Sequence, residues 1–175
     1  MKIAVAALIA GILLFPGLAA RAGNDLTSHQ TWALAYAAVV GTSYYADPVP
    51  ADYDFALTLA SVLTQESSLC HHKRGIDSRA YGCGQLQRPT AHFVYGEPIS
   101  IHKLQHDDAL NIRLAARYLV YCMQQMSSWE RSVICYNKGP YRASHMPVAA
   151  VAADPYLHAI RRRMGEAQLL MASDD

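Results

Sequence analysis

Residues 55–91 read FALTLASVLTQESSLCHHKRGIDSRAYGCGQLQRPTA, and this stretch decides the fold expected for the chain. Its first part repeats apolar residues at intervals of three and four, which predicts an amphipathic helix; they are Phe55, Leu59, Val62, Leu63 and Leu69. Glu66 lies on the same face, because it follows Leu59 by seven positions and Val62 by four. A carboxyl group there loses hydration, which raises its pKa toward the range of a general acid. The spacing also fits a solvated glutamate at the rim of the helix end.

Two glycines follow this helix in Ala80-Tyr81-Gly82-Cys83-Gly84-Gln85, and glycines of this kind allow the backbone to approach a ligand closely. This segment, together with Glu66-Ser67 before it and Pro89-Thr90-Ala91 after it, resembles the catalytic domain of the soluble lytic transglycosylases. These are lysozyme-like enzymes that cleave peptidoglycan. Two further blocks similar to that family stand downstream, NIRLAARYL at Asn111–Leu119 and CYNKG at Cys135–Gly139. The resemblance spans about residues 52–142.

The rest of the chain follows helical periods. Helices are expected over residues 28–45, 89–95, about 107–126 and about 129–136, where Ser127 and Glu130 have the spacing of a capping box. A last helix opens at Pro155 and has Tyr156, Leu157, Ile160 and Met164 as its apolar stripe. No alternating strand pattern and no internal repeat occurs in the sequence. With the resemblance, this predicts an all-α, lysozyme-like single domain over residues 23–175, of about six to seven helices with little or no sheet.

Residues 1–22 have the layout of a secretory signal peptide, with Lys2 before an apolar run and the small-x-small sequence Ala20-Arg21-Ala22 at its end. Cleavage after Ala22 leaves 13 basic and 14 acidic residues, a net charge of −1. That charge argues against nucleic acid or anionic lipid as a partner. We therefore expect export to the periplasm with no stable membrane anchor after cleavage. The alternative is an uncleaved anchor, for which the apolar run is barely long enough.

Four cysteines behind an export signal predict disulfides. Cys122 and Cys135 lie at nearly equal distances on either side of the turn near Ser128, so two antiparallel helices would bring them to the same level. Cys70 would then pair with Cys83 and close the polar loop between them. Sequence alone leaves all three pairings open, and four free thiols or a zinc site are the alternatives.

An adjacent pair, His71-His72, stands in that polar loop and invites a metal interpretation. No further ligands stand at useful spacing, so we expect these to be solvated loop side chains. We expect neither a metal nor a cofactor.

Carried over position by position, the resemblance makes Glu66 the catalytic acid and base. Ser67 corresponds to a serine that orients the substrate or the carboxyl, and Gln85 lines the saccharide groove. Tyr136 and Asn137 correspond to the tyrosine and asparagine beside the glutamate and the N-acetyl group of the sugar. Each also has a structural interpretation, as a helix-end hydrogen bonder for Ser67 and Asn137, a core aromatic for Tyr136 and an exposed loop residue for Gln85.

Four positions depart from the family blocks. Cys83 and Gly84 replace a Leu-Met pair, and Cys135 and Lys138 replace the alanines of the Ala-Tyr-Asn-Ala-Gly block. These departures put the preference for particular sugar subsites in doubt more than the catalytic step.

The function implied by the resemblance is a peptidoglycan lytic transglycosylase, a lyase that cleaves the β-1,4 bond between MurNAc and GlcNAc and leaves 1,6-anhydroMurNAc ends. Such an enzyme uses one glutamate as acid and then as base, whereas most glycosidases use two carboxylates. The sequence agrees, because the next acids after Glu66 are Asp77, Glu97 and the Asp107-Asp108 pair.

Two alternatives remain open. One is a hydrolytic N-acetylmuramidase on the same fold, and the other is a non-catalytic exported module that binds glycan or assists secretion. A short chain without wall-anchoring repeats also fits a role in opening the wall for a secretion or conjugation apparatus. That expectation rests on size alone.

Overall fold

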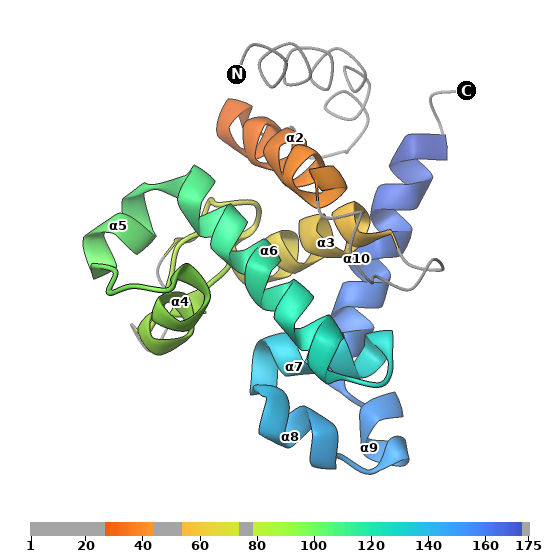
Figure 1. Ribbon diagram of the computed structural model, residues 1–175. Coiled ribbons are helices and arrows are strands. Elements are labelled where there is room, and N and C mark those ends of the chain that lie inside the picture. The colour runs from red at the N-terminus through yellow and green to blue at the C-terminus, as the bar shows by residue number, and fades with distance from the viewer. Residues whose placement is uncertain (1–26, 44–53, 74–78, 173–175) are drawn as a thin grey trace.

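The computed structural model describes residues 27–43, 54–73 and 79–172, which are mainly helical (Figure 1). The helices are α2 (Ser28–Ser43), α3 (Phe55–Ser67), α4 (Arg88–Tyr95), α5 (Ile101–His106), α6 (Asp108–Gln125), α7 (Trp129–Lys138), α8 (Pro140–His145), α9 (Val148–Ala152) and α10 (Pro155–Ala172). Two short strands, β1 (Ala80–Tyr81) and β2 (Leu86–Gln87), form an antiparallel pair. The expected mainly α fold with little sheet is confirmed. The nine helices of the described ranges exceed six or seven because α5, α8 and α9 are short helices in segments expected to be connectors.

Helix α3 is the central element, and α2, α6 and α10 pack against it (Figure 1). Its apolar face is fully buried at Phe55, Leu59, Val62 and Leu63. Burial of a side chain of this size stabilises the fold by about 1.5–3 kcal/mol. The helix begins at the cap residue Asp54, whose carboxylate accepts the Leu57 N–H over 2.9 Å. The core therefore fixes α3 over nearly its whole length, including the C-terminal turn that contains Glu66.

Helices α6 and α7 form a hairpin that the Cys122–Cys135 disulfide closes. Asp107 caps α6 by accepting the Leu110 N–H over 2.9 Å. The expected capping box of Ser127 with Glu130 is wrong, because Ser128 is the N-cap of α7 and its hydroxyl accepts the Arg131 N–H. The cap moves one residue along the chain because α7 begins at Trp129, and only the residue directly before the helix has an oxygen placed against its free N–H groups.

Both disulfides expected from the sequence are present. Cys70–Cys83 and Cys122–Cys135 each join residues 13 positions apart. In the chain-entropy model, closing a loop of this length contributes about 3 kcal/mol to stability.

Every helix in the described part of the chain is too short or too polar to span a bilayer. The expected signal peptide, residues 1–22, lies outside the described residues, as does Asp77.

We expect peptide mapping without reductant to recover Cys70 linked to Cys83 and Cys122 linked to Cys135, because each pair lies on neighbouring elements of the fold. The same digest after reduction and alkylation is the control and should yield four separate cysteine peptides. A peptide that joins Cys83 to Cys135 would contradict the hairpin arrangement.

Candidate active site

Glu66 stands in the last turn of α3, where its side chain is half-buried. The hydroxyl of Tyr156, from the first turn of α10, donates to Glu66 Oε1 over 2.6 Å. Burial raises the pKa of Glu66 from 4.5 to about 7, and the hydrogen bond from Tyr156 opposes that rise because it favours the charged carboxylate. At neutral pH the carboxyl is therefore divided between its acid and base forms, which suits a group that must both donate and accept a proton.

Tyr156 is the residue of this site that sequence reasoning missed, since its spacing placed it in the apolar stripe of the last helix. Burial, and next the charge of Glu66, raise the pKa of Tyr156 well above 10.0, so its hydroxyl stays protonated as a donor. A buried tyrosine needs a partner for its hydroxyl, so a tyrosine among aliphatic stripe residues was the available signal. The partner could not be named from sequence, because it lies 90 positions away.

Tyr136 reaches the site from α7 and is buried, with only 7% of its surface exposed. Its hydroxyl donates to the Gly84 carbonyl over 2.7 Å. Burial, and next the charge of Glu66, raise the pKa of Tyr136 well above 10.0. A Cβ at Gly84 would lie 2.7 Å from that hydroxyl and 2.6 Å from the Ala115 Cβ, so only glycine fits there. The glycine that replaces the family methionine therefore allows close packing against Tyr136.

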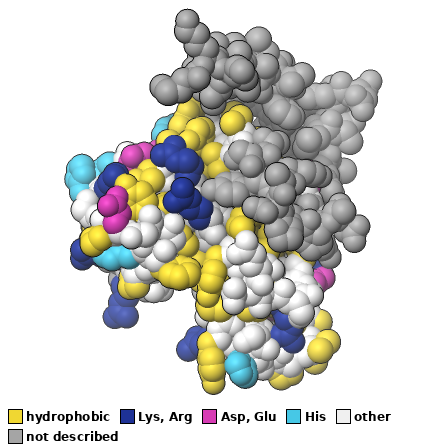
Figure 2. Space-filling model, in the orientation of Figure 1, with side chains coloured by type: hydrophobic (Ala, Val, Ile, Leu, Met, Phe, Trp, Pro, Cys, Tyr) yellow, Lys and Arg dark blue, Asp and Glu magenta, His cyan; other side chains and the backbone are white. Residues whose placement is uncertain are grey.

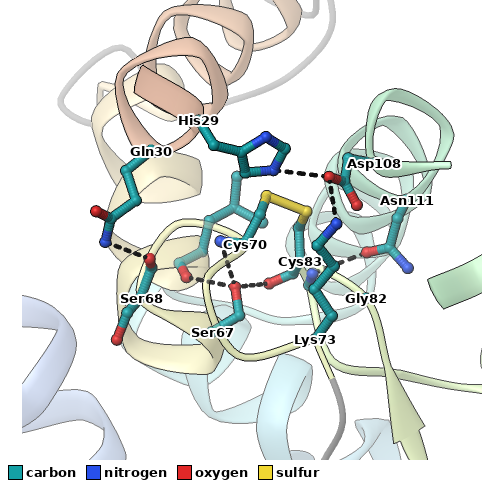
Figure 3. Close-up of a disulfide and its surroundings, with 12 residues drawn as sticks. His29, Gln30, Ser67, Ser68, Cys70, Lys73, Gly82, Cys83, Asp108 and Asn111 are labelled. Atoms are coloured by element: carbon teal, nitrogen blue, oxygen red, sulfur yellow. Dashed lines mark hydrogen bonds and ion pairs between the residues drawn. A yellow bond between two sulfur atoms is a disulfide. The ribbon is translucent and has the colours of Figure 1, made fainter. Parts of the chain in front are cut away.

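Asn111, buried in α6, binds the backbone of the glycine-rich segment, residues 80–85 (Figure 3). Its Oδ1 accepts the Gly84 N–H over 2.8 Å, and its Nδ2 donates to the carbonyls of Tyr81 and Leu104. Gly82 has a φ of +76°, and a Cβ there would collide with Asn111 and with the Leu104 carbonyl. The Asn111 amide thus holds the segment against α6, and Gly82 and Gly84 leave the space that this close contact needs.

Ser67 ties the end of α3 to this segment. Its buried hydroxyl donates to the Cys83 carbonyl over 2.7 Å and accepts the Cys70 N–H over 2.9 Å (Figure 3). Ser68, Leu69 and Cys70 follow with φ values of 51°, 54° and 69°, a left-handed turn that costs side-chain-bearing residues energy. The Ser67 contacts and the disulfide to Cys83 hold this turn in place, directly beside Glu66.

Among the other expected site residues, Asn137 is exposed and Gln85 is half-buried, as Glu66 is. Gln85 has a φ of +46°, and its Nε2 donates to the Gly82 carbonyl over 2.8 Å. Asn137 is exposed near the C-terminal end of α7, next to Tyr136. The described contacts therefore bring Glu66, Tyr136 and the glycine-rich segment together, and they leave Asn137 at the surface.

The other described acids that follow Glu66 in this part of the sequence have different surroundings. Asp107 caps α6, and Glu97 is exposed after α4. Asp108, at 8% exposure, has its Oδ2 within 2.8 Å of both Lys73 Nζ and His29 Nε2 (Figure 3). Cys70 lies near His29 and Asp108, and these three residue types can bind a metal ion. The Cys70 sulfur, however, is bonded to Cys83. Asp108 of α6 thus connects Lys73 with His29 of α2.

We expect Glu66→Gln to stabilise the fold at alkaline pH. The pKa of Glu66 is higher in the folded chain than in the unfolded chain. A rise in pH from about 4.5 to about 7 therefore lowers the free energy of unfolding by up to roughly 3 kcal/mol. The amide does not titrate. Urea unfolding should therefore show the variant to be more stable than wild type near pH 8 and equal to it near pH 4.

Glu97→Gln serves as the control, because Glu97 is exposed and its replacement should leave both unfolding curves unchanged. Equal stability of Glu66→Gln and wild type at both pH values would show that the Glu66 carboxyl is not strained by burial.

The comparison with protein families supports the resemblance. The family model described as the transglycosylase SLT domain matches residues 54–148. The searches of curated proteins and of solved structures found no match. The matched residues contain Glu66, the glycine-rich segment, Asn111 and Tyr136, whereas Tyr156 lies beyond them. They cover more than half of the chain, so the protein belongs to the transglycosylase SLT domain family and has its general, glycan-cleaving type of function.

Proposed function

We propose that this protein is a peptidoglycan lytic transglycosylase that cleaves the MurNAc–GlcNAc β-1,4 bond without water, with Glu66 as both acid and base. One observation carries the proposal. A half-buried carboxyl inside the family-matched residues has a pKa of about 7 and a tyrosine donor at 2.6 Å. A carboxyl with this pKa can exchange a proton near neutral pH.

The first step is proton donation. Protonated Glu66 gives its proton to the glycosidic oxygen as the bond between that oxygen and the muramic C1 breaks, leaving an oxocarbenium-like sugar and a free GlcNAc hydroxyl. Glu66 is then a carboxylate, and the Tyr156 hydrogen bond stabilises that form. In the second step the 6-hydroxyl of the same muramic sugar attacks C1 and returns its proton to Glu66. The product is the 1,6-anhydro ring, and the enzyme regains its starting state.

The surrounding residues support this chemistry in different ways. Ser67 orients the end of α3 through its bonds to Cys83 and Cys70, which is the carboxyl-orienting role rather than a sugar contact. Tyr136 supports the glycine-rich segment by donating its hydroxyl to the Gly84 carbonyl. We assign Gln85 and Asn137 to the sugar, because Asn137 is exposed, Gln85 is only partly buried, and amides can bond hydroxyl or N-acetyl groups.

The surface beside the family-matched helices suits a glycan strand. The face in Figure 2 is indented between the part containing α4 and α5 and the part containing α7 to α9, and hydrophobic side chains border the indentation. Exposed aromatic residues occur on both parts, with Phe93 on α4 and Tyr141 on α8. Grooves that bind organic ligands combine such rings with a few polar groups.

The substrate and the predicted export signal agree on a location. Peptidoglycan strands lie outside the cytoplasmic membrane, and two disulfides are stable in an oxidising compartment. We therefore place the activity in the periplasm. A secretion or conjugation apparatus as partner stays a prediction from the size of the chain.

We expect Glu66→Gln to abolish cleavage of purified peptidoglycan, with a loss of at least about a thousandfold, because an amide of the same shape cannot transfer the proton. Turbidity loss of a peptidoglycan suspension measures the rate, and helical circular dichroism checks the fold. Glu97→Gln is the matched control and should retain the wild-type rate. Comparable clearing by Glu66→Gln would remove Glu66 from the mechanism.

The products should separate transglycosylase from hydrolase. The 6-hydroxyl is held next to C1 at a high effective concentration, so intramolecular attack outcompetes water. Mass spectrometry should find muropeptides lighter by one water than hydrolysis products, and digestion in oxygen-18 water should leave the new ends unlabelled. Labelled, reducing ends would assign the protein to the muramidases, whereas binding without any product would leave the non-catalytic module.

A further inference from the structure

Lys138, the last residue of α7, forms an ion pair that connects this helix to the start of α10. Its Nζ lies 2.9 Å from Oδ2 of Asp154, and the side chains are 31% and 2% exposed respectively. The sequence departs from its family at this position, where the Ala-Tyr-Asn-Ala-Gly block has an alanine. A buried carboxylate is costly without a partner, so the pairing is a strong constraint on the local backbone.

Asp154 divides its two oxygens between Lys138 and the start of α10. Its Oδ1 accepts the N–H of Tyr156 over 2.9 Å and that of Leu157 over 3.1 Å, which makes it the N-cap of the helix. Burial alone would raise the pKa of Asp154, but Lys138 and the two N–H groups together hold it below the ordinary value. The carboxylate therefore stays charged and keeps both sets of contacts.

The capped turn contains the tyrosine that faces the catalytic candidate. Tyr156 bonds Asp154 through its backbone N–H and Glu66 through its hydroxyl. The contacts form a continuous series from Lys138 on α7, through Asp154 and Tyr156 of α10, to Glu66 on α3. A shift of the first turn of α10 would move the hydroxyl away from Glu66 Oε1.

We propose that Lys138 is a positioning residue, whose ion pair with Asp154 fixes the first turn of α10 and thereby holds the Tyr156 hydroxyl against the Glu66 carboxyl. The role of Glu66 in this inference rests on the function proposed above. The contact series itself rests on distances alone.

In the described chain, Tyr156 from α10 donates its hydroxyl to Glu66, and Tyr136 from α7 lies close enough for the charge of Glu66 to raise the pKa of its hydroxyl. The neighbouring helices α2 and α6 carry charges that pair elsewhere, His29 with Asp108 and Arg113 with Tyr36. A change at Lys138 should therefore reach Glu66 through Tyr156, and this can be measured without any substrate.

The experiment is a carbon-13 NMR titration of the glutamate carboxyls in the full chain, which contains four glutamates. The signal missing from Glu66→Gln assigns Glu66. Tyr156→Phe removes the donor that stabilises the carboxylate, so the Glu66 midpoint should rise by about one pH unit. Lys138→Met should raise it in the same direction by at least about half of that amount. Lys138→Arg keeps the charge and should restore most of the wild-type midpoint.

Lys103→Met is the matched control, because Lys103 is an exposed lysine on α5 that bonds Tyr95 and does not contact α10. It should leave the Glu66 midpoint unchanged. In the Tyr156→Phe background, Lys138→Met should add no further shift. Two results would overturn the proposal. One is an unchanged Glu66 midpoint in Lys138→Met, and the other is a midpoint shift by Lys138→Met that is as large in the Tyr156→Phe background as in the wild type.

The double variant with Lys138→Met and Asp154→Asn covers the case in which the single variant does not fold. Asparagine still caps a helix, and no unpaired carboxylate remains buried. Its Glu66 midpoint must also rise, or the proposal is wrong. The two hypotheses fail separately, because a wild-type chain that releases no product refutes the enzyme, whereas an unmoved midpoint refutes the positioning role.

Discussion

The hydrogen bond between Tyr156 and Glu66 joins residues that are 90 positions apart, and the proposed chemistry of the site depends on it. Burial at the end of α3 favours the protonated carboxyl, whereas the tyrosine favours the carboxylate. The two effects oppose each other, so the pKa settles at about 7 instead of at an extreme. A group with this balance can donate a proton to a leaving oxygen and recover one afterwards, which explains how a single carboxyl could serve a complete reaction cycle.

The Glu66 carboxyl can stay at this distance from Tyr156 only if the end of α3 is held in place, and several local contacts hold it. Ser67 and the Cys70–Cys83 disulfide fix the left-handed turn that follows Glu66. Asn111 holds the glycine-rich segment, and Gly84 lets that segment lie against the Tyr136 hydroxyl. The replacement of the family Leu-Met pair by Cys83 and Gly84 thus exchanges an apolar contact for a covalent link and closer backbone packing.

The sequence alone determined the helical class and the central helix, because these depend on local periods. It favoured one pairing of the cysteines but left all three open, and the structure contains the favoured pairing. Phe55, Leu59, Val62 and Leu63 mark a buried face by their spacing, and all four are fully buried. The family blocks identified the segment that the family model also matches. Short helices such as α5 and α9 escaped notice, because five or six residues hold too few periods to rise above the pattern of a connector.

Only the tertiary structure decided which groups meet at Glu66. The sequence marks Tyr156 only as a tyrosine in an apolar stripe and Lys138 only as a lysine in place of the family alanine, and neither pattern names a partner. The packing of α7, α10 and α3 gives them their partners (Figure 1). It places the Tyr156 hydroxyl at the Glu66 carboxyl and the Lys138 ammonium at Asp154, the cap of α10. Long-range packing sets these distances, and a one-dimensional pattern contains periods but no distances between helices.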